Sequence, residues 1–392
     1  MNKILILSHY YPPYIKGGAE ISTALLAQQL TKVCEVTVAT TRFTNDIWRH
    51  DGIIVRPVFT DPEQPATNPV QTLRHYLDMF SYHLTNWYQT RTLIRDINPD
   101  CVICVFGSHY FFPCIVAAIT TGRPILIDVR DYTLFPLTNA NRSPLRFLIY
   151  QYERTVSWLY RSFIRWYSWR SNNVVFIALS NFLGRKLTEQ GFPPKRIHVI
   201  PNIAQEFHSL KNEKRRPYQI IFAGRLTEEK GVLDAIQAVQ LLPELPITLL
   251  IVGDGPELPK LREYVTQHNL SRIIFLGKKP NTEVLQLYAE SKLIIAPSVW
   301  PEPFGRFIQE SFATLTPCIA TRSGGISEGI THGRTGLLVK PGDPQELSNA
   351  IKRLLKDTDL YTQIVRNLKN ERSTFSPKKI TKQRLQIIKD LL

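Results

Sequence analysis

Two acidic residues, Glu302 and Glu310, lie within the run PSVWPEPFGRFIQES at residues 297–311. Two prolines and a glycine interrupt regular structure around the first acid, so Glu302 is predicted to lie on a loop. The residues from Arg306 onward favour a helix, which would place Glu310 about one turn inside it. Carboxylates accept hydrogen bonds from hydroxyl groups and free N–H groups at a helix start hold anions, so this segment suits a polyhydroxylated ligand with a phosphate. The alternative is a turn acid and an acid on a solvated helix face.

Two cations occupy a second candidate segment, IIFAGRLTEEKGVLDAI at residues 220–236. Its apolar start, residues 220–223, is typical of a strand, and apolar residues recur at helical spacing from Val232 onward. Arg225 and Lys230 would therefore lie on the loop beyond the carboxyl end of the strand, where ligands bind in open α/β sheets. Arginine can hold a diphosphate with two parallel hydrogen bonds, and lysine adds a point charge. The alternative is a pair of ordinary surface cations.

Six motifs in order along the chain carry a family resemblance. They are PPYIKGGAE (12–20), FAGRLTEEKG (222–231), VGDGPE (252–257), PEPFG (301–305) followed by Glu310, SGGISE (323–328) and GRTGLLV (333–339). The chain resembles the retaining, nucleotide-sugar-dependent glycosyltransferases of family 4. That resemblance implies the α/β fold called GT-B, with two Rossmann-like doubly wound parallel-sheet domains that face a central cleft and a C-terminal helix that crosses back to the first domain.

The resemblance also implies roles for these residues. Arg225 and Lys230 would stabilise the departing diphosphate, while Glu302 would hold sugar hydroxyls and Glu310 would reach the ribose. The remaining donor-binding candidates are glycines, where a side chain would obstruct a phosphate, and backbone N–H groups: Gly17, Gly18, Gly224, Gly253, Phe304 and Gly305. The family retains anomeric configuration, needs no metal or other cofactor, and can use a donor phosphate oxygen in place of a protein base.

The acceptor side departs from the family pattern. Many members place a histidine at the end of the strand that here reads PILIDVRDY, where this chain has Arg130 and Asp131. His109, in FGSHYFFP, matches a second family pattern. We therefore predict His109, Arg130 and Asp131 on the acceptor side; a loop histidine satisfied by backbone groups is the alternative for His109. Leu315 stands where the family usually has glycine.

The composition fits a chain of this architecture. The chain has 392 residues, 43% of them hydrophobic, enough for two domains of about 180 residues each. We predict an N-terminal acceptor-side domain over 1–200, a linker over 201–217, a nucleotide-sugar-binding domain over 218–365 and a helical tail over 366–392 that returns to the first domain. No apolar run reaches the roughly 18 residues that span a bilayer, and the start KILILS predicts a buried strand rather than a secretory signal. We expect a protein on the cytoplasmic side of the membrane.

Metal-binding patterns are weak in this sequence. Five cysteines fit a reducing compartment. Cys101 and Cys104 form a C-x-x-C pattern, but they lie on a predicted strand, where residues three apart point to opposite faces. Asp357 and Asp359 form a D-x-D pattern that follows helical sequence, which favours a helix-terminal turn. We predict no metal site.

The net charge of +15 concentrates partly in residues 142–170. On a helical wheel this segment has an apolar stripe that includes Leu159 and Trp166, with Arg161 and Arg165 among the arginines on the opposite face. A basic, aromatic, amphipathic helix suits the surface of an anionic membrane. The alternative is that the apolar stripe packs on the sheet of the first domain. No nucleic-acid-binding motif is present, so nucleic acid is not an expected partner.

Two classes of function stay open. The first is an active retaining glycosyltransferase that transfers a sugar from a UDP- or GDP-sugar to a saccharide or lipid-linked acceptor, in cell-surface polysaccharide or glycolipid synthesis. The second is a catalytically silent relative that binds a nucleotide-sugar or glycan as a scaffold. A nicotinamide-dependent dehydrogenase is disfavoured, because no G-x-G-x-x-G pattern follows the first strand.

Overall fold

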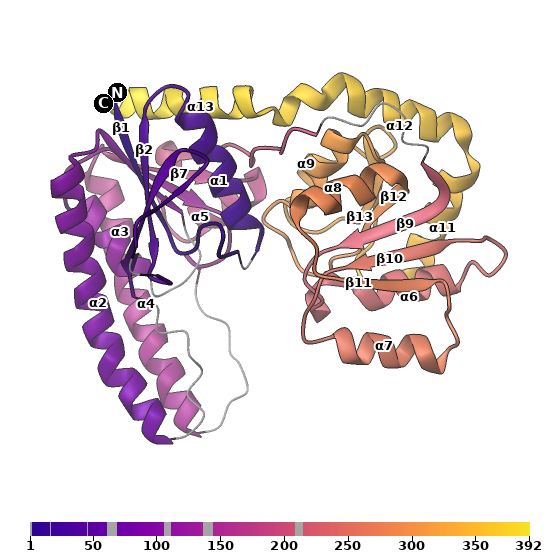
Figure 1. Ribbon diagram of the computed structural model, residues 1–392, viewed down its shortest axis with the longest axis horizontal. Helices are drawn as coiled ribbons and strands as arrows, with labels where there is room; N and C mark the ends of the chain where they lie inside the picture. Colours follow the sequence, from indigo (N-terminus) through magenta and orange to yellow (C-terminus); the bar gives the residue numbers. More distant parts are fainter. Residues whose placement is uncertain are drawn as a thin grey trace. The chain divides into compact units, whose positions relative to one another are not determined.

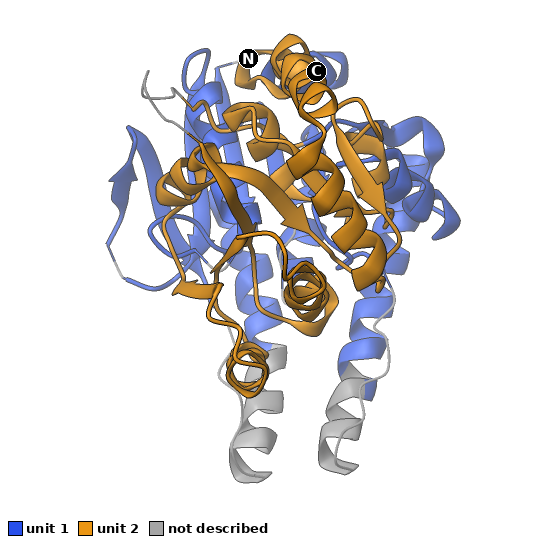
Figure 2. Cartoon of the chain, turned by 90° about the vertical axis from the view of Figure 1, so that its right-hand side faces the viewer, with its two compact units in different colours: residues 1–201, 380–392 blue, residues 202–379 orange. Residues whose placement is uncertain are grey.

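The chain forms two compact units, residues 1–201 together with 380–392, and residues 202–379 (Figure 2). The computed structural model describes residues 2–15, 17–44, 46–60, 69–105, 111–135, 144–207 and 215–392, with the main chain alone at 69–80, 144–150 and 152. Each unit has its own sheet with helices packed on it. The predicted α/β architecture with two parallel sheets is therefore confirmed.

The first unit contains an eight-stranded sheet in the order β3-β4-β2-β1-β5-β6-β7-β8. Figure 1 shows its helices packed around this sheet. Its strands are β1 (Lys3–Ser8), β2 (Glu35–Thr41), β3 (Trp48–His50), β4 (Ile53–Phe59), β5 (Cys101–Val105), β6 (Ile125–Val129), β7 (Val174–Ala178) and β8 (Ile197–Val199). All neighbours pair in parallel except β3 with β4. The central strands are buried on both faces, as continuous apolar runs in a covered parallel sheet predict. Chain direction across the sheet reverses between β1 and β5, which marks its switch point.

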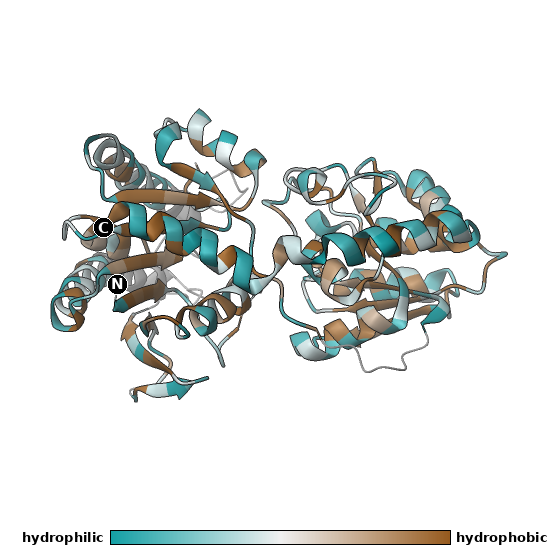
Figure 3. Cartoon of the chain, turned by 90° about the horizontal axis from the view of Figure 1, so that it is seen from above, coloured by the Kyte–Doolittle hydropathy of each residue, from teal (hydrophilic) through white to brown (hydrophobic). Residues whose placement is uncertain are grey.

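Five helices connect these strands: α1 (Gly18–Leu30), α2 (Pro69–Ile97), α3 (Phe112–Ile119), α4 (Pro144–Arg170) and α5 (Asn181–Glu189). The short helix α3 is apolar and almost fully buried, since α2 packs against it and it packs against α4. Ser180 begins α5 by accepting a hydrogen bond from the Leu183 amide at 3.1 Å. Figure 3 shows the strands of both units as mainly hydrophobic and the helices as alternating between hydrophobic and hydrophilic residues.

The second unit contains a six-stranded parallel sheet in the order β11-β10-β9-β12-β13-β14. The strands are β9 (Arg216–Ala223), β10 (Thr248–Val252), β11 (Ile273–Gly277), β12 (Ser291–Ala296), β13 (Cys318–Thr321) and β14 (Gly336–Val339). The first strand of this unit, β9, lies beside its fourth, β12. The loops that follow β9 and β12 therefore diverge at the switch point, where α/β sheets bind ligands.

Helices of the second unit are α6 (Val232–Gln240), α7 (Leu258–Gln267), α8 (Asn281–Glu290), α9 (Arg306–Thr314), α10 (Ile326–Gly329), α11 (Pro344–Lys356) and α12 (Thr358–Glu371). Leu315 ends α9 with a φ of 57°. This left-handed conformation explains why glycine suits the position. Asp357 accepts a hydrogen bond from the Leu360 amide and begins α12, so the D-x-D pattern is a helix terminus as predicted.

The last helix, α13 (Pro377–Leu391), packs on the first unit through a buried ion cluster. Arg384 on α13 and Arg130 beyond β6 each lie 2.7 Å from the same oxygen of Asp128 on β6. All three side chains are buried. Burial alone would raise the pKa of Asp128, but the charges and hydrogen bonds of the two arginines outweigh it and hold that pKa below its usual value. The predicted return of the C-terminal helix to the first domain is thus confirmed.

Replacement of Arg384 by methionine tests this cluster. Arg384→Met leaves the buried Asp128 with Arg130 as its remaining charged partner in the cluster, so we expect the free energy of unfolding to fall by about 3–5 kcal/mol. Urea denaturation at neutral pH measures this change. The control is Lys382→Met on the same helix, an exposed position where a change within about 0.5 kcal/mol is expected.

The pH dependence gives the sign of the Asp128 contribution. Because its folded pKa is lowered, the ion pairs stabilise the protein above the unfolded carboxyl pKa of about 3.9, and this stabilisation is lost as the pH falls through the lower folded value. The stability gap between wild type and Arg384→Met should therefore narrow below about pH 4. A gap that stays constant through acid denaturation would contradict this assignment.

Candidate active site

The loop that follows β9 is held against the loop that follows β12 at the switch point of the second sheet. Glu229 and Lys230 lie in a short 3-10 turn (η3, Glu228–Lys230), and Gly231 links that turn to α6. Gly231 has a φ of 63°, and a β-carbon there would lie 2.1 Å from the carbonyl oxygen of Pro297. Only glycine permits so close an approach between the two loops.

One carbonyl group joins the two loops directly. The Glu229 oxygen accepts hydrogen bonds from the Val299 amide at 2.9 Å and from the Ser298 hydroxyl at 2.9 Å. The Trp300 amide adds a third, longer contact at 3.3 Å. Main-chain groups therefore fix where the side chains of both loops begin.

Lys230 and Glu302 form an ion pair across this junction. The Glu302 carboxylate also lies 3.0 Å from the Ser298 hydroxyl and shares the one proton of that hydroxyl with the Glu229 carbonyl. The side chains of Glu302 and Lys230 are 13% and 29% exposed, so both retain a path to solvent and to a ligand. The predicted loop positions of both residues are confirmed, and the fold brings together two predicted site residues that lie 72 positions apart.

A third loop, after β13, holds the backbone of Glu302. The Gly325 amide donates to the Glu302 carbonyl at 2.7 Å, and the Ser323 hydroxyl donates to the Trp300 carbonyl at 2.8 Å. Gly324 has a φ of 57°, and a β-carbon there would lie 2.4 Å from the Glu302 carbonyl oxygen. The SGG motif thus supports the acid from behind.

Arg225 lies at the start of the same β9 loop, with an exposed side chain. Within the described part of the chain, no hydrogen bond or ion pair engages its guanidinium group. Its backbone is fixed by β10 and the loop that follows it. The Leu226 amide donates to the Asp254 carbonyl at 2.9 Å, and the Gly224 amide donates to the Val252 carbonyl at 3.0 Å. A β-carbon on Gly253 would lie 1.8 Å from the Gly224 carbonyl oxygen, which explains the glycine there. A fixed backbone with an unengaged guanidinium suits an anionic ligand.

Glu310 lies one turn into α9, as predicted, and its side chain is buried. Arg306 pairs with it at 2.9 Å, one turn earlier on the same helix. Burial raises the pKa of the neighbouring Tyr288 well above its usual value, and the negative charge of Glu310 adds to that effect. Phe304 is buried against Phe375, with ring centroids 5.8 Å apart. The helix therefore starts from a packed base.

The first unit positions its candidate residues at its own switch point. Gly17 precedes α1, and its amide donates to the Glu20 carboxylate at 2.7 Å, with Gly18 as the first helical residue. His9, directly after β1, is buried against Tyr10 with ring centroids 4.0 Å apart. His109 falls in the loop after β5, outside the described residues.

Arg130 and Asp131 differ in their burial and in how many hydrogen-bond partners their side chains have. The buried Arg130 guanidinium donates to the Thr23 hydroxyl at 2.9 Å and the Ala19 carbonyl at 2.5 Å, besides its pair with Asp128. It therefore holds the first turns of α1, directly behind Gly17 and Gly18. Asp131 is only half-buried, and one of its oxygens accepts a hydrogen bond from the Thr133 amide at 2.8 Å.

Helix α4 departs in part from the prediction, although Arg154, another of its arginines, is exposed as expected. Arg161 is buried and donates to the Phe135 carbonyl at 2.7 Å, and Arg165 donates to the Gln190 carbonyl at 2.9 Å. Leu159 and Trp166, which were expected in a single apolar stripe opposite the arginines, are 54% and 49% exposed. The prediction that these two arginines face outward is wrong, because loop carbonyls in the fold bind them; residues 142 and 146 lie outside the described side chains.

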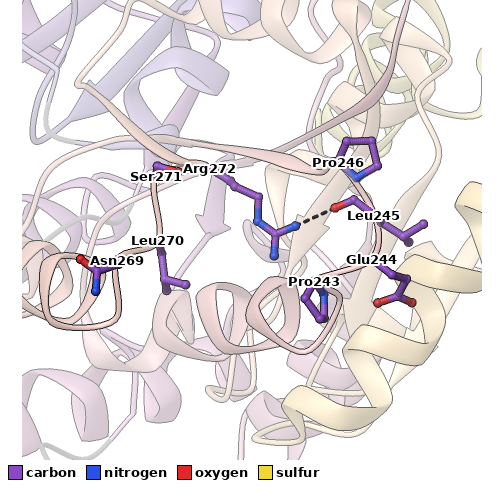
Figure 4. A pocket seen from close by; sticks show the side chains of 8 residues that line it. All are labelled: Pro243, Glu244, Leu245, Pro246, Asn269, Leu270, Ser271 and Arg272. Carbon is purple, nitrogen blue, oxygen red and sulfur yellow. Dashed lines mark hydrogen bonds between the residues drawn. The ribbon is translucent and has the colours of Figure 1, made fainter.

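A depression at the amino-terminal edge of the second sheet lacks the charged pair found at the switch point. It has a volume of about 440 Å³ and is lined by residues 243–246 and 269–272 (Figure 4). Its one cation, Arg272, donates to the carbonyl groups of Leu242 and Leu245 at 3.1 and 2.6 Å. That guanidinium closes the end of α6 and has a structural role.

Metal-binding geometry is not found in the part of the chain that the structure describes. No group of three or more histidine, cysteine, aspartate or glutamate side chains there could hold a metal ion. Cys101 and Cys104 are both buried on β5, and burial raises the pKa of Cys101 to about 12. Among the described helices, none combines the length and apolar character needed to cross a bilayer.

Sequence reasoning missed three residues that support the site. Ser298 holds Glu302, and nothing in its local pattern indicates that contact. Arg306 could have been found, because it lies four residues before Glu310 on a predicted helix, the spacing at which opposite charges pair. The contact of Arg384 with Asp128 joins residues 256 positions apart, and no local pattern reveals it.

Comparison with known proteins places this geometry in a family. The profile described as Glycosyltransferase Family 4 matches residues 16–204, and the profile described as Glycosyl transferases group 1 matches residues 204–371. N-acetyl-alpha-D-glucosaminyl L-malate synthase of Bacillus anthracis is 35% identical over 199 residues, which are 48% of this chain and 51% of that protein. The chain spans about half the length of the curated relatives it matches.

Solved structures show the same fold. The complex of Anabaena HepE with UDP-glucose gives a TM-score of 0.72 at 22% identity and covers 99% of both chains. Sucrose-phosphate synthase from Thermosynechococcus elongatus gives a TM-score of 0.79 at 19% identity, over 100% of this chain and 99% of that one. Because the two profiles together cover residues 16–371 and the fold is GT-B, the chain belongs to the family 4 glycosyltransferases.

Proposed function

We propose that this protein is a retaining, metal-independent glycosyltransferase that moves a sugar from a nucleoside-diphosphate sugar to a saccharide or lipid-linked acceptor, in the synthesis of a cell-surface polysaccharide or glycolipid. The observation that carries the proposal is the junction at the second switch point. There an acid fixed by three loops lies against Lys230, on the same short loop as the unengaged Arg225. This arrangement supplies a hydroxyl acceptor and two cations at the edge where such sheets bind ligands.

The leaving group is where the two cations would act. As the bond between the sugar and the diphosphate breaks, negative charge grows on the diphosphate. Arg225 and Lys230 would stabilise that charge more in the transition state than in the ground state, which is the condition for catalysis. The N–H groups of Phe304 and Gly305, at the start of α9, would add donors to the same anion. Neither role requires a metal ion.

The two acids would bind the donor at different points. Glu302 would accept hydrogen bonds from sugar hydroxyls, while the Lys230 ammonium group would also attract the diphosphate. Glu310, buried and paired with Arg306, would bind the ribose hydroxyls. The complex of Anabaena HepE contains UDP-glucose, which makes UDP-sugars the first donors to test. A donor phosphate oxygen would take the acceptor proton, so a protein base is not required.

The acceptor would be bound by the first unit. Gly17 and Gly18 would allow close approach at the start of α1, and Asp131 and His109 would contact the acceptor from the loops after β6 and β5. Arg130 would act through position, because its guanidinium already holds Ala19 and Thr23 on α1. These assignments rest on the topology of the first sheet and on the family pattern.

We also propose that the protein works at the cytoplasmic surface of an anionic membrane, through the segment 142–170. The support is the outer face of α4, where Trp158, Leu159, Trp166 and Trp169 are exposed. Arg170 lies 4.6 Å from the Trp166 ring, so a cation accompanies the aromatic surface. Aromatic residues beside cations suit the interface between an anionic bilayer and water.

Donor turnover is the first test of the function. The purified protein should hydrolyse at least one UDP- or GDP-sugar from a panel, or transfer its sugar to an acceptor. A coupled assay should detect the released nucleoside diphosphate. The anomeric configuration of the product, read by NMR, should match that of the donor. Binding of a nucleotide-sugar without turnover, with every acceptor tried, would support the scaffold alternative instead.

Single substitutions should separate the proposed roles. Arg225→Ala should lower kcat/KM, with a loss of about 2–4 kcal/mol of transition-state stabilisation. It should also weaken binding of the free nucleoside diphosphate, because it removes a diphosphate contact. Glu302→Gln should reduce transfer by a similar order but leave nucleoside diphosphate binding nearly intact. Glutamine keeps the acceptor for Ser298, so the loop should stay in place. Kinetics and calorimetric titration with UDP measure both effects.

Matched variants serve as controls for these measurements. Glu310→Gln should weaken UDP binding, unlike Glu302→Gln, because its proposed partner is the ribose. Lys352→Met breaks an exposed ion pair with Glu244 at 2.8 Å elsewhere in the same unit, and should change neither quantity. The assignment of roles is wrong if Glu302→Gln weakens UDP binding as much as Arg225→Ala does.

Membrane contact has its own test. The wild-type protein should float with vesicles that contain phosphatidylglycerol at low salt and should stay at the bottom of the gradient with pure phosphatidylcholine vesicles. Binding should weaken as salt rises, since screening reduces attraction between exposed charges. Absence of flotation with anionic vesicles at low salt would remove the membrane proposal and leave the transferase proposal unaffected.

A further inference from the structure

A cavity of about 470 Å³ lies on the first unit, between α2 and the turn that follows α3. Its lining is basic, aromatic and hydroxylated, and consists of Trp87, Tyr88, Arg91, Thr92, Ile94, Arg95, Thr120, Thr121 and Arg123. Three of these nine residues are arginines, and none of the nine is an acid. A hollow with this lining favours an anion that carries several acceptor oxygens.

The arginines are held in place by neighbouring groups, and no acid lines the cavity beside them. Arg91 donates to the Thr120 hydroxyl at 3.1 Å, and its guanidinium carbon lies 5.1 Å from the centre of the Trp87 ring. Arg123 donates to the side chain of Asn98. Arg95 contacts its neighbour Asp96 at 3.1 Å, an exposed pair that costs little to rearrange. Arg91 in particular is oriented by an aromatic face and a hydroxyl group, and none of the described acids pairs with it.

The cavity is separate from the residues assigned to sugar transfer. It is formed at the last turns of α2 and at the connection from α3 to β6, which lie at the amino-terminal edge of the first sheet. The candidate residues Gly17, Gly18 and Asp131 follow strands and lie at the carboxyl edge. An anion in this cavity would therefore be neither the donor nor the reacting group of the acceptor.

The surroundings of the cavity point to a bilayer. Leu84, Trp87 and Tyr88 are exposed and share with Arg91 and Arg95 one face of α2, at the spacing i, i+3, i+4, i+7 and i+11. Helix α4 contacts α2 through the hydrogen bond between Tyr160 and His83 at 3.2 Å, and its own exposed set is Trp158, Leu159, Trp166 and Trp169. Figure 1 shows the two helices side by side. Four of the six tryptophans of the chain thus lie on the outer faces of two neighbouring helices.

We propose that this cavity binds the phosphate group of an anionic lipid, while Trp87 and Tyr88 lie in the interface beside it. Arginine can bind phosphate oxygens with paired hydrogen bonds, and the threonine hydroxyls supply further donors. Tryptophan and tyrosine favour the depth of the lipid headgroups. The inference rests on the membrane contact proposed above and names a specific lipid site for it, on α2 and outside the segment 142–170.

The extent of the surface agrees with this partner. Helices α2 and α4 both begin at the carboxyl edge of the sheet and end at its amino edge, because each connects two parallel strands. A bilayer against their outer faces would reach from the lipid site at one edge to the candidate acceptor loops at the other. A lipid-linked acceptor could then meet those acceptor loops without leaving the membrane.

The test compares vesicle binding of paired variants. The double variant Arg91→Gln, Arg95→Gln should bind phosphatidylglycerol vesicles roughly 30-fold more weakly than wild type, the effect of two cations near such a surface. The control, Lys260→Gln with Lys279→Gln, removes two exposed charges from the second unit and should leave vesicle binding within about twofold of wild type. Both double variants should keep the thermal unfolding midpoint and the donor hydrolysis rate of wild type, which shows that they fold.

Each outcome decides between sources of the anion. If wild type binds and the Arg91, Arg95 variant binds equally well, the lipid site is overturned while the membrane contact stands. If wild type itself does not bind, the membrane contact fails and this inference fails with it, whereas donor turnover remains a separate result. If calorimetric titration shows that wild type binds glycerol phosphate at low millimolar concentration and phosphatidylglycerol vesicles do not compete with it, the cavity takes a soluble phosphate ester and the assignment to a bilayer lipid is overturned. Trp87→Ala should weaken vesicle binding as well, since it removes the aromatic wall.

Discussion

The junction between the loops after β9 and β12 is the constraint on which the candidate active site depends. When two neighbouring parallel strands connect to opposite halves of the sheet, the loops that follow them diverge. This divergence leaves a space at the carboxyl edge of the sheet. In this protein the Glu229 carbonyl closes the base of that space, and the Lys230–Glu302 pair lies above it. The backbone geometry of the two loops therefore brings the charges of Lys230 and Glu302 together.

Three glycines make this geometry attainable. Gly231, Gly253 and Gly324 each lie where a β-carbon would come within 2.4 Å of a carbonyl oxygen of a neighbouring loop, and each has a positive φ. Loops packed this closely have little freedom to rearrange. A rigid frame of this kind suits a reaction in which the protein stabilises developing charge, since donors that are already oriented need no reorganisation during the step.

Much of this frame could be predicted from the sequence, for identifiable reasons. The loop position of Glu302, the helical position of Glu310 and the two parallel sheets follow from local signals, namely proline and glycine punctuation and apolar runs of strand length. The facing of α4 could not be predicted, because Arg161 is bound by a loop carbonyl whose position depends on the tertiary fold. The contact of Ser298 with Glu302 likewise depends on a loop conformation that Gly231 imposes from another segment.

The cluster around Asp128 has a consequence for the order in which the molecule matures. The first unit contains residues 1–201, but it also needs residues 380–392 to bury its carboxylate between two guanidinium groups. On the ribosome, the whole second unit is synthesised before Arg384 emerges. The N-terminal half therefore begins to fold first and is completed last, and until then a charged aspartate beside the sheet has Arg130 as its single cluster partner. This part of the first unit therefore stays incompletely packed until Arg384 has emerged.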